Sequence, residues 1–224
     1  MSDIPYHFLS GFIALTVPLL FVAVLLDKGD TRRIILYFCW GTFASVLSFN
    51  LNNFFGLSLL QSARMTTSVA PVVEEICKGL PVLLFLNRKK YPHINKTIVL
   101  CAMSSGVGFS VLETMYYFST SSREVSDLLA LVVRVLTTSL MHCTVTAIFG
   151  IGLLLLQRQR QMIVPIIFGL TALCTSLHAL FNLLLDTRLA ILALIMPVVL
   201  FLGCWMVMSK TNSVNRGIVE EEDD

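Results

Sequence analysis

Charged residues are scarce in this sequence: 13% of its 224 residues are Asp, Glu, Lys or Arg, whereas 56% are hydrophobic. A soluble domain carries roughly a quarter charged residues, so the composition excludes a water-soluble domain. The few charges gather in short runs between apolar stretches that are long enough to cross a bilayer. We therefore expect an all-α fold, a polytopic bundle of transmembrane helices that forms a single integral-membrane domain over residues 1–224.

Cysteine pairs and a cleavable leader are also missing. None of the six cysteines forms a CxxC pair, so neither a zinc knuckle nor a redox motif is indicated. All six lie within apolar segments, and we interpret them as small packing residues. The first residues, MSDIPYH, lack a basic segment and a cleavage site, which predicts that the first apolar segment is a retained anchor.

Seven apolar runs predict about seven transmembrane helices. They cover residues 8–26, 34–54, 69–86, 97–119, 128–156, 162–185 and 189–208. Most basic residues lie in alternate loops, those that follow the first, third, fifth and seventh runs. The positive-inside rule therefore places the N-terminus outside and the acidic tail, residues 209–224, in the cytoplasm. A net charge of +2, spread over membrane-flanking loops, gives no indication of a nucleic-acid partner.

Ionisable side chains lie inside the third to sixth runs, where they are costly. They are Glu74, Glu75, Lys78, Glu113, Arg134, His142 and His178. A charge near the bilayer centre costs about 3 kcal/mol even on lenient insertion scales. Counted from the predicted outer ends, the acids and imidazoles lie at similar depths, roughly 8 Å down for the pair at positions 74 and 75. We expect them to share one hydrated pocket in the outer half of the bilayer.

Spacing within each helix supports a shared pocket. Glu74 and Lys78 are four residues apart, so we expect them to pair, with Glu75 pointing about 100° away. His178 and Asn182 have the same spacing and are expected to project into one cavity. Each feature alone is explained by an ion pair, helix packing or a hydrogen bond between helices. Together, on four successive helices, they favour a reaction site.

These residues resemble the motifs of PrsW-type intramembrane proteases, in the same order along the chain. The matching segments are Glu74-Glu75-x-x-Lys78, Gly106-x-Gly108-Phe109 followed by Glu113, Arg134 with His142, and His178 with Asn182. Both glycines would also allow a neighbouring helix to approach closely. The resemblance covers residues 69–185, which we take as the catalytic helices.

The resemblance implies an intramembrane endopeptidase that cuts a membrane-anchored regulatory protein, such as an anti-sigma factor, near the extracytoplasmic face. It implies a multi-pass protein of a bacterial or archaeal cytoplasmic membrane, with that substrate and the lipid bilayer as its partners. CAAX prenyl endopeptidases and bacteriocin-processing enzymes are similar, with the patterns EExxxR, FxxxH and HxxxN or HxxxD. Lys78 and Glu113 depart from those patterns, so a prenylated substrate is the less favoured alternative.

One mechanism that the resemblance allows is free of metal. Glu75 would be the general base that activates water, and Glu74 would position it. His142 would share or orient that water, while His178 and Asn182 would donate hydrogen bonds to the oxyanion. Three further residues would support the site: Lys78, Glu113 and Arg134.

A zinc mechanism is also consistent with the sequence. Glu113, His142 and His178 would supply three ligands, water would take the fourth position, and Glu75 would act as the base. The sequence does not choose between the two mechanisms, so the cofactor stays open between none and zinc.

Motifs of other intramembrane hydrolases are missing. No HExxH segment is present, every Asp lies outside the predicted spans, and Ser104-Ser105-Gly106 is not the GxSG of rhomboids. A proton- or ion-coupled transporter would use the same buried Glu and His residues, although no inverted repeat is visible. A membrane scaffold without catalytic activity is the third alternative.

Overall fold

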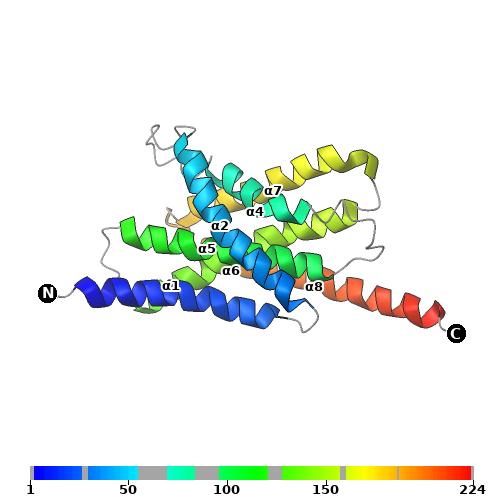
Figure 1. Ribbon diagram of the computed structural model, residues 1–224, viewed down its shortest axis with the longest axis horizontal. Helices are drawn as coiled ribbons and strands as arrows, with labels where there is room; N and C mark the ends of the chain where they lie inside the picture. The colour runs from blue at the N-terminus through cyan, green and yellow to red at the C-terminus, as the bar shows by residue number, and fades with distance from the viewer. Residues whose placement is uncertain are drawn as a thin grey trace.

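The computed structural model describes residues 3–26, 30–54, 70–83, 96–120, 128–156, 160–185 and 187–222. In these ranges it contains seven α-helices, shown in Figure 1: α1 (Asp3–Leu25), α2 (Thr31–Phe54), α4 (Ala70–Leu83), α5 (Lys96–Thr120), α6 (Leu128–Leu156), α7 (Ile163–Leu185) and α8 (Ala190–Glu222). A short 3-10 turn, η2 (Arg160–Met162), precedes α7. The predicted all-α fold with about seven helices is confirmed. Most of the predicted tail, residues 209–222, continues α8 as helical backbone.

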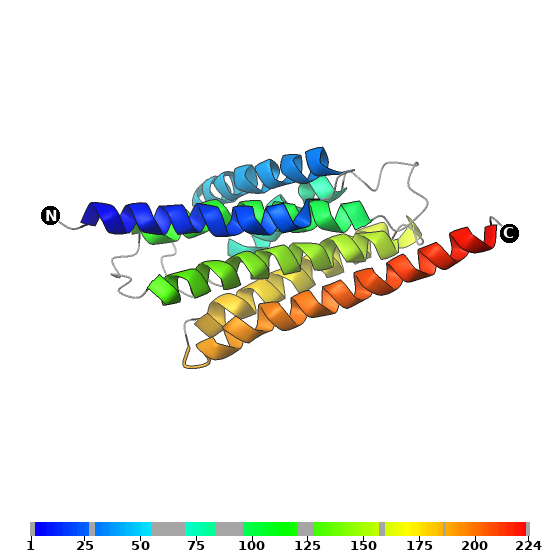
Figure 2. The same cartoon turned by 90° about the horizontal axis from the view of Figure 1, so that it is seen from below.

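Five helices of the described chain are long and apolar enough to cross a membrane: α2, α5, α6, α7 and α8. α1 contributes a shorter apolar stretch, Gly11–Val22. The described part of α4 has 14 residues, which span about 21 Å. The predicted third run extends to residue 86, and its end lies outside the described residues. The two termini lie at opposite ends of the long axis (Figures 1 and 2). The protein is an integral multi-pass membrane protein.

α5 is the central helix of the bundle. α1 and α2 pack on one side of it and α6 on the other, with α7 and α8 beyond α6 (Figure 2). The expected close approach at its glycines is confirmed, since a Cβ on Gly106 would meet the backbone of His142 and one on Gly108 would meet the backbone of Phe38. Small residues at these two crossings let the backbones of α5, α6 and α2 touch.

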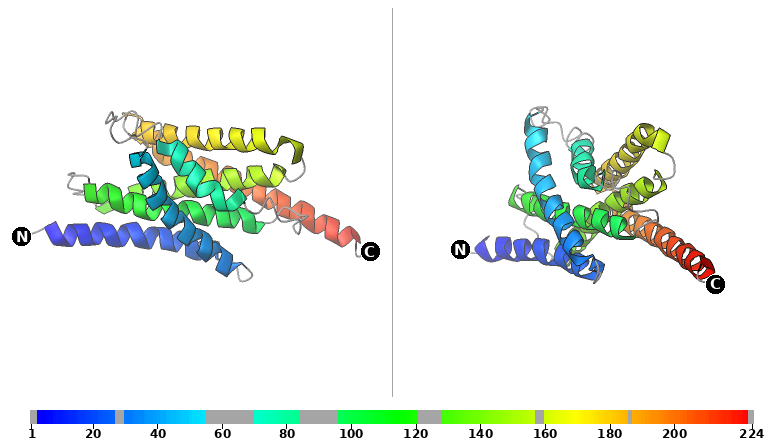
Figure 3. Two further views of the ribbon diagram at one scale, coloured as in Figure 1. Left: turned by 45° about the horizontal axis from the view of Figure 1, so that its top comes forward. Right: turned by 45° about the vertical axis from the view of Figure 1, so that its right-hand side comes forward.

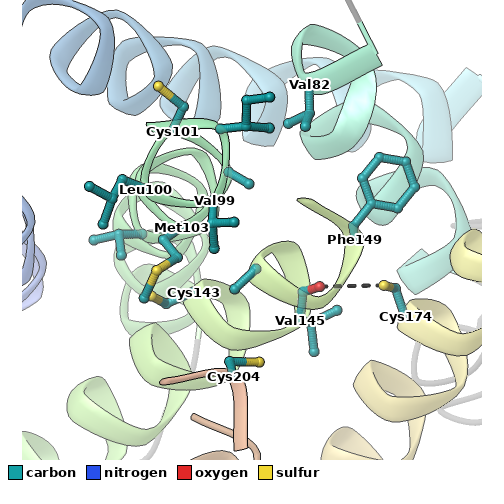
Figure 4. Close-up of a cluster of buried hydrophobic side chains, with 14 of the residues drawn as sticks. Val82, Val99, Leu100, Cys101, Met103, Cys143, Val145, Phe149, Cys174 and Cys204 are labelled. Carbon is teal, nitrogen blue, oxygen red and sulfur yellow. Dashed lines mark hydrogen bonds between the residues drawn. The ribbon is translucent and has the colours of Figure 1, made fainter. Parts of the chain in front are cut away.

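Buried cysteines fill the core between α5, α6, α7 and α8. Figure 4 shows Cys101, Cys143, Cys174 and Cys204 among valine, methionine and phenylalanine side chains. All six cysteines are free, and the Cys174 thiol donates to the carbonyl oxygen of Val145 at 3.3 Å. The predicted role as packing residues is confirmed for the five buried cysteines, whereas Cys39 is exposed.

α4 lies between α2 and α7 (Figure 3) and is held against α2 by hydrogen bonds to its backbone. Pro81 has no N–H, so the carbonyl of Cys77, four residues earlier, lacks its helical partner. The indole Nε1 of Trp40 donates to that carbonyl at 3.0 Å, and the hydroxyl of Tyr37 donates to the carbonyl of Pro81 at 2.8 Å. These two bonds fix the rotation of α4 and therefore the direction in which its acidic residues point.

Candidate functional site

Four helices bring ionisable side chains into one buried cluster. α4 contributes Glu74, Glu75 and Lys78, α5 contributes Glu113, α6 contributes His142 and α7 contributes His178. Lys78, His142 and His178 are 0% exposed and Glu75 is 5% exposed. The rings of His142 and His178 meet edge to face with their centres 4.8 Å apart. The acids and imidazoles that were expected to lie together therefore do meet in one cluster.

Lys78 pairs with Glu75 and not with Glu74. Its Nζ lies 2.6 Å from Oε1 of Glu75, so the predicted pair with Glu74 was wrong. Residues three and four apart on a helix are both neighbours, and the sequence alone does not choose between them. Other helices make the choice, because Nζ also lies 2.8 Å from Nδ1 of His142 and 4.5 Å from the centre of the Phe109 ring. The sequence motif included Phe109, but nothing in it indicated this contact.

The hydrogen-bond chain defines where the protons lie. An ammonium group can only donate, so Nδ1 of His142 accepts from Lys78 and the ring proton sits on Nε2. That Nε2 donates to Oε2 of Glu113. On α7, Nδ1 of His178 lies 2.7 Å from Oε1 of Glu75 and donates to it. A neutral His178 therefore has an unprotonated Nε2.

Two buried atoms of the cluster have no hydrogen-bond partner. They are Oε2 of Glu74 and Nε2 of His178, and they lie 3.7 Å apart. A buried polar atom without a partner costs about 1–3 kcal/mol and calls for an explanation, such as a bound ion or a catalytic role. The rest of the chain of contacts, from Glu113 to His178, pairs donors with acceptors.

A cavity of about 50 Å³ adjoins the cluster. It is lined by Glu113, Thr114, Arg134, Thr138, His142, Phe181, Asn182 and Leu185. A water molecule fits in this volume. Two sequence-predicted residues, Arg134 and Asn182, lie here, whereas His178, expected to share a cavity with Asn182, is not among the lining residues. The sequence did not point to Thr114 or Thr138, which are the other polar residues of the cavity wall.

The cluster contains two groups of three donors that could hold a metal ion. One consists of Glu75, His142 and His178, the other of Glu74, Glu113 and His178, and within each group the donor atoms lie within 4.8 Å of one another. Carboxylate oxygen and imidazole nitrogen are ligands that zinc accepts. The zinc ligands predicted from the sequence, Glu113, His142 and His178, are divided between the two groups.

Comparison with known families agrees with this site. The model described as PrsW family intramembrane metalloprotease matches residues 30–208, a range that contains every helix of the cluster. The chain belongs to the PrsW family. It is therefore a membrane-embedded protease, and the family's description as a metalloprotease agrees with the acid- and imidazole-rich donor groups. No curated protein and no solved structure matches the chain.

Proposed function

We propose that this PrsW-family protein hydrolyses a peptide bond of a membrane-anchored regulatory protein, of the anti-sigma-factor kind, near the extracytoplasmic face of the membrane. The observation that carries the proposal is the gap between Glu74 and His178. Two unpartnered polar atoms face each other across 3.7 Å inside a cluster whose other bonds are satisfied. A scaffold or a structural ion-pair network would pair these two atoms, whereas a hydrolase needs polar atoms that are free to act on its substrate. The water molecule would occupy the adjoining cavity of about 50 Å³.

The depth of the cluster supports cleavage close to one membrane surface. Glu74 is the fifth residue of α4, while Glu113 and His178 each lie seven residues before the ends of α5 and α7. These helix ends belong to the side of the membrane that the positive-inside rule assigns to the exterior. His142 lies in the middle of α6, which has 29 residues and exceeds the ~20 that a bilayer requires.

The contacts favour Glu74 over Glu75 as the group that accepts the proton of the attacking water. Glu75 already accepts hydrogen bonds from Lys78 and His178 through Oε1, which makes it a weak base. Glu74 has a buried oxygen that no donor reaches. From there the proton would pass to the leaving amine, since a general base in hydrolysis becomes the general acid of the next step.

Asn182 would stabilise the oxyanion from the adjoining cavity. It follows His178 by one helical turn, and its amide group can donate to a developing negative charge. The metal that the family description implies would be held by acids and imidazole of the cluster, and would polarise the scissile carbonyl and lower the proton affinity of bound water. Each of these roles belongs to a hydrolytic reaction.

The test is cleavage of a co-expressed single-pass substrate, followed by fragment analysis. We expect wild-type protein to release the fragment, and Glu74→Gln and His178→Ala to abolish release at equal expression. Ser176→Ala is the matched control on α7, because its hydroxyl only bonds the carbonyl of Ala172, and it should retain activity. Unchanged cleavage in Glu74→Gln and His178→Ala would contradict the proposal. Proton-driven uptake by the wild-type protein that both variants lose would also contradict it.

A further inference from the structure

The cluster already contains one cation, the ammonium group of Lys78, and this cation occupies one of the two donor groups. Its Nζ lies between Oε1 of Glu75 at 2.6 Å and Nδ1 of His142 at 2.8 Å. The second ring nitrogen of His142 donates to Glu113. Both nitrogens of His142 are therefore engaged, and a metal ion placed there would meet the positive charge of Lys78 at close range.

In the second donor group, Glu74, Glu113 and His178, two of the donor atoms have no hydrogen-bond partner. Nε2 of His178 is completely buried, unprotonated in the neutral ring, without a partner, and directed at the equally unpartnered Oε2 of Glu74. Zinc binds nitrogen and oxygen at about 2.1 Å, so two of its ligands in a tetrahedral site are about 3.4 Å apart. The observed 3.7 Å differs from that spacing by a few tenths of an ångström and is too long for a hydrogen bond.

We propose that Glu74, Glu113 and His178 hold a divalent cation of the zinc class, and that Glu75, His142 and Lys78 are positioning residues. Glu75 accepts the Nδ1–H of His178 and so directs Nε2 toward the ion. His142 donates to Glu113 and holds its carboxylate. A hydrogen-bonded partner behind each ligand is typical of metal sites, and losing one lowers metal affinity 10- to 100-fold.

The catalytic role of this cation rests on the proposed function, and the cation site is compatible with that function. The cation would take Oε2 of Glu74, the buried oxygen that faces His178, so with the cation bound the proton would go to Oε1 of Glu74. The assignment also changes the ligand set expected from the sequence, since Glu74 replaces His142. The reason is Lys78, whose ammonium group takes the place beside His142.

Zinc titration of the chelator-treated full-length protein in lipid nanodiscs tests the site. We expect one zinc per chain, a more than 100-fold loss of affinity in Glu74→Gln, and a 10- to 100-fold loss in Glu75→Gln. Ser176→Ala should bind zinc within twofold of wild type. Wild-type protein that binds no zinc, or Glu74→Gln that binds it as tightly as wild type, would overturn the assignment.

Cu²⁺ bound to the wild-type protein gives a second readout that needs no variant. Electron spin-echo modulation counts coordinated imidazoles, and the proposed group contains one whereas the group with His142 contains two. One imidazole supports the assignment, and two overturn it. Cleavage by zinc-free protein would refute the proposed cation site but would not contradict the proposed proteolysis. Stoichiometric zinc at this site without any cleavage would refute the proposed function alone.

Discussion

Nζ of Lys78 on α4 lies 2.8 Å from Nδ1 of His142 on α6 and donates a hydrogen bond to it. The same ammonium group binds Glu75 and lies over the ring of Phe109. A single buried cation thus connects α4, α5 and α6 at the site, and the tautomer of His142 follows from it. Lys78 therefore has a structural role in joining three helices, which the sequence motif alone does not indicate.

Removing that cation should destabilise the protein. Lys78→Met leaves the carboxylate of Glu75 buried without its ion-pair partner, and we expect a loss of about 3–5 kcal/mol in the free energy of unfolding. Unfolding in mixed micelles, monitored by circular dichroism, measures the loss. Adding Glu75→Gln to this variant removes the uncompensated charge and should recover part of the stability. Equal stability of Lys78→Met and wild type would contradict the buried pair.

The bond from Trp40 to the carbonyl of Cys77 should matter only because Pro81 follows four residues later. Trp40→Phe should cost about 1–3 kcal/mol, since it leaves a buried carbonyl without a donor. In a Pro81→Ala background the alanine N–H can bond that carbonyl, so the same substitution should cost distinctly less. A double-mutant cycle of unfolding free energies measures the difference. A cost that is the same in both backgrounds would show that the indole bond is unrelated to the proline.

Gly106 should tolerate no side chain, because a Cβ there would meet the backbone of His142. We expect Gly106→Ala to cost about 1–3 kcal/mol and to lower cleavage, since α5 and α6 must move apart at the site. Gly169 on α7 is the matched control, as its Cβ would have nothing within 4 Å. Gly169→Ala should stay within about 0.5 kcal/mol of wild type in the same unfolding assay. A reversed order of the two variants would contradict the packing of α5 on α6.

Asn182 should act on the rate and not on substrate binding. If it donates to the oxyanion, Asn182→Ala should lower kcat by about 10²–10³-fold and leave KM nearly unchanged. Asn50 on α2 is a matched control, because its amide bonds the carbonyl of Val46 in its own helix and is exposed. Kinetics with a purified single-pass substrate in nanodiscs separate the two parameters. A change confined to KM would assign Asn182 to substrate positioning instead.

Much of the fold could be predicted from the sequence, because crossing a bilayer imposes a length and a composition on each helix. The helices at residues 128–156 and 162–185 were predicted within a residue or two of their observed bounds. The last run differs more, since it was predicted to end at residue 208 and α8 continues as helix to Glu222. The cost of burying charge also predicted that acids and imidazoles on separate helices would meet.

The partners within the cluster could not be predicted. Helical periodicity places Lys78 beside both Glu74 and Glu75, and the pair predicted from spacing was the wrong one. The same holds for the donor groups, because nothing in the sequence indicated that Lys78 would reach Nδ1 of His142. Which donor pairs with which acceptor depends on distances between helices, and these cannot be predicted from the spacing of residues along one helix.

The sequence by itself thus determined the membrane-spanning architecture and the residues that form the cluster, since both follow from the free energy of placing side chains in a bilayer. Only the tertiary structure decided which donor faces which acceptor. That outcome depends on the rotation of α4, fixed by Trp40 and Tyr37, and on the close approach of α5 to α6 at Gly106. These contacts turn one lysine toward His142 and leave Glu74 and His178 facing each other with a gap between them.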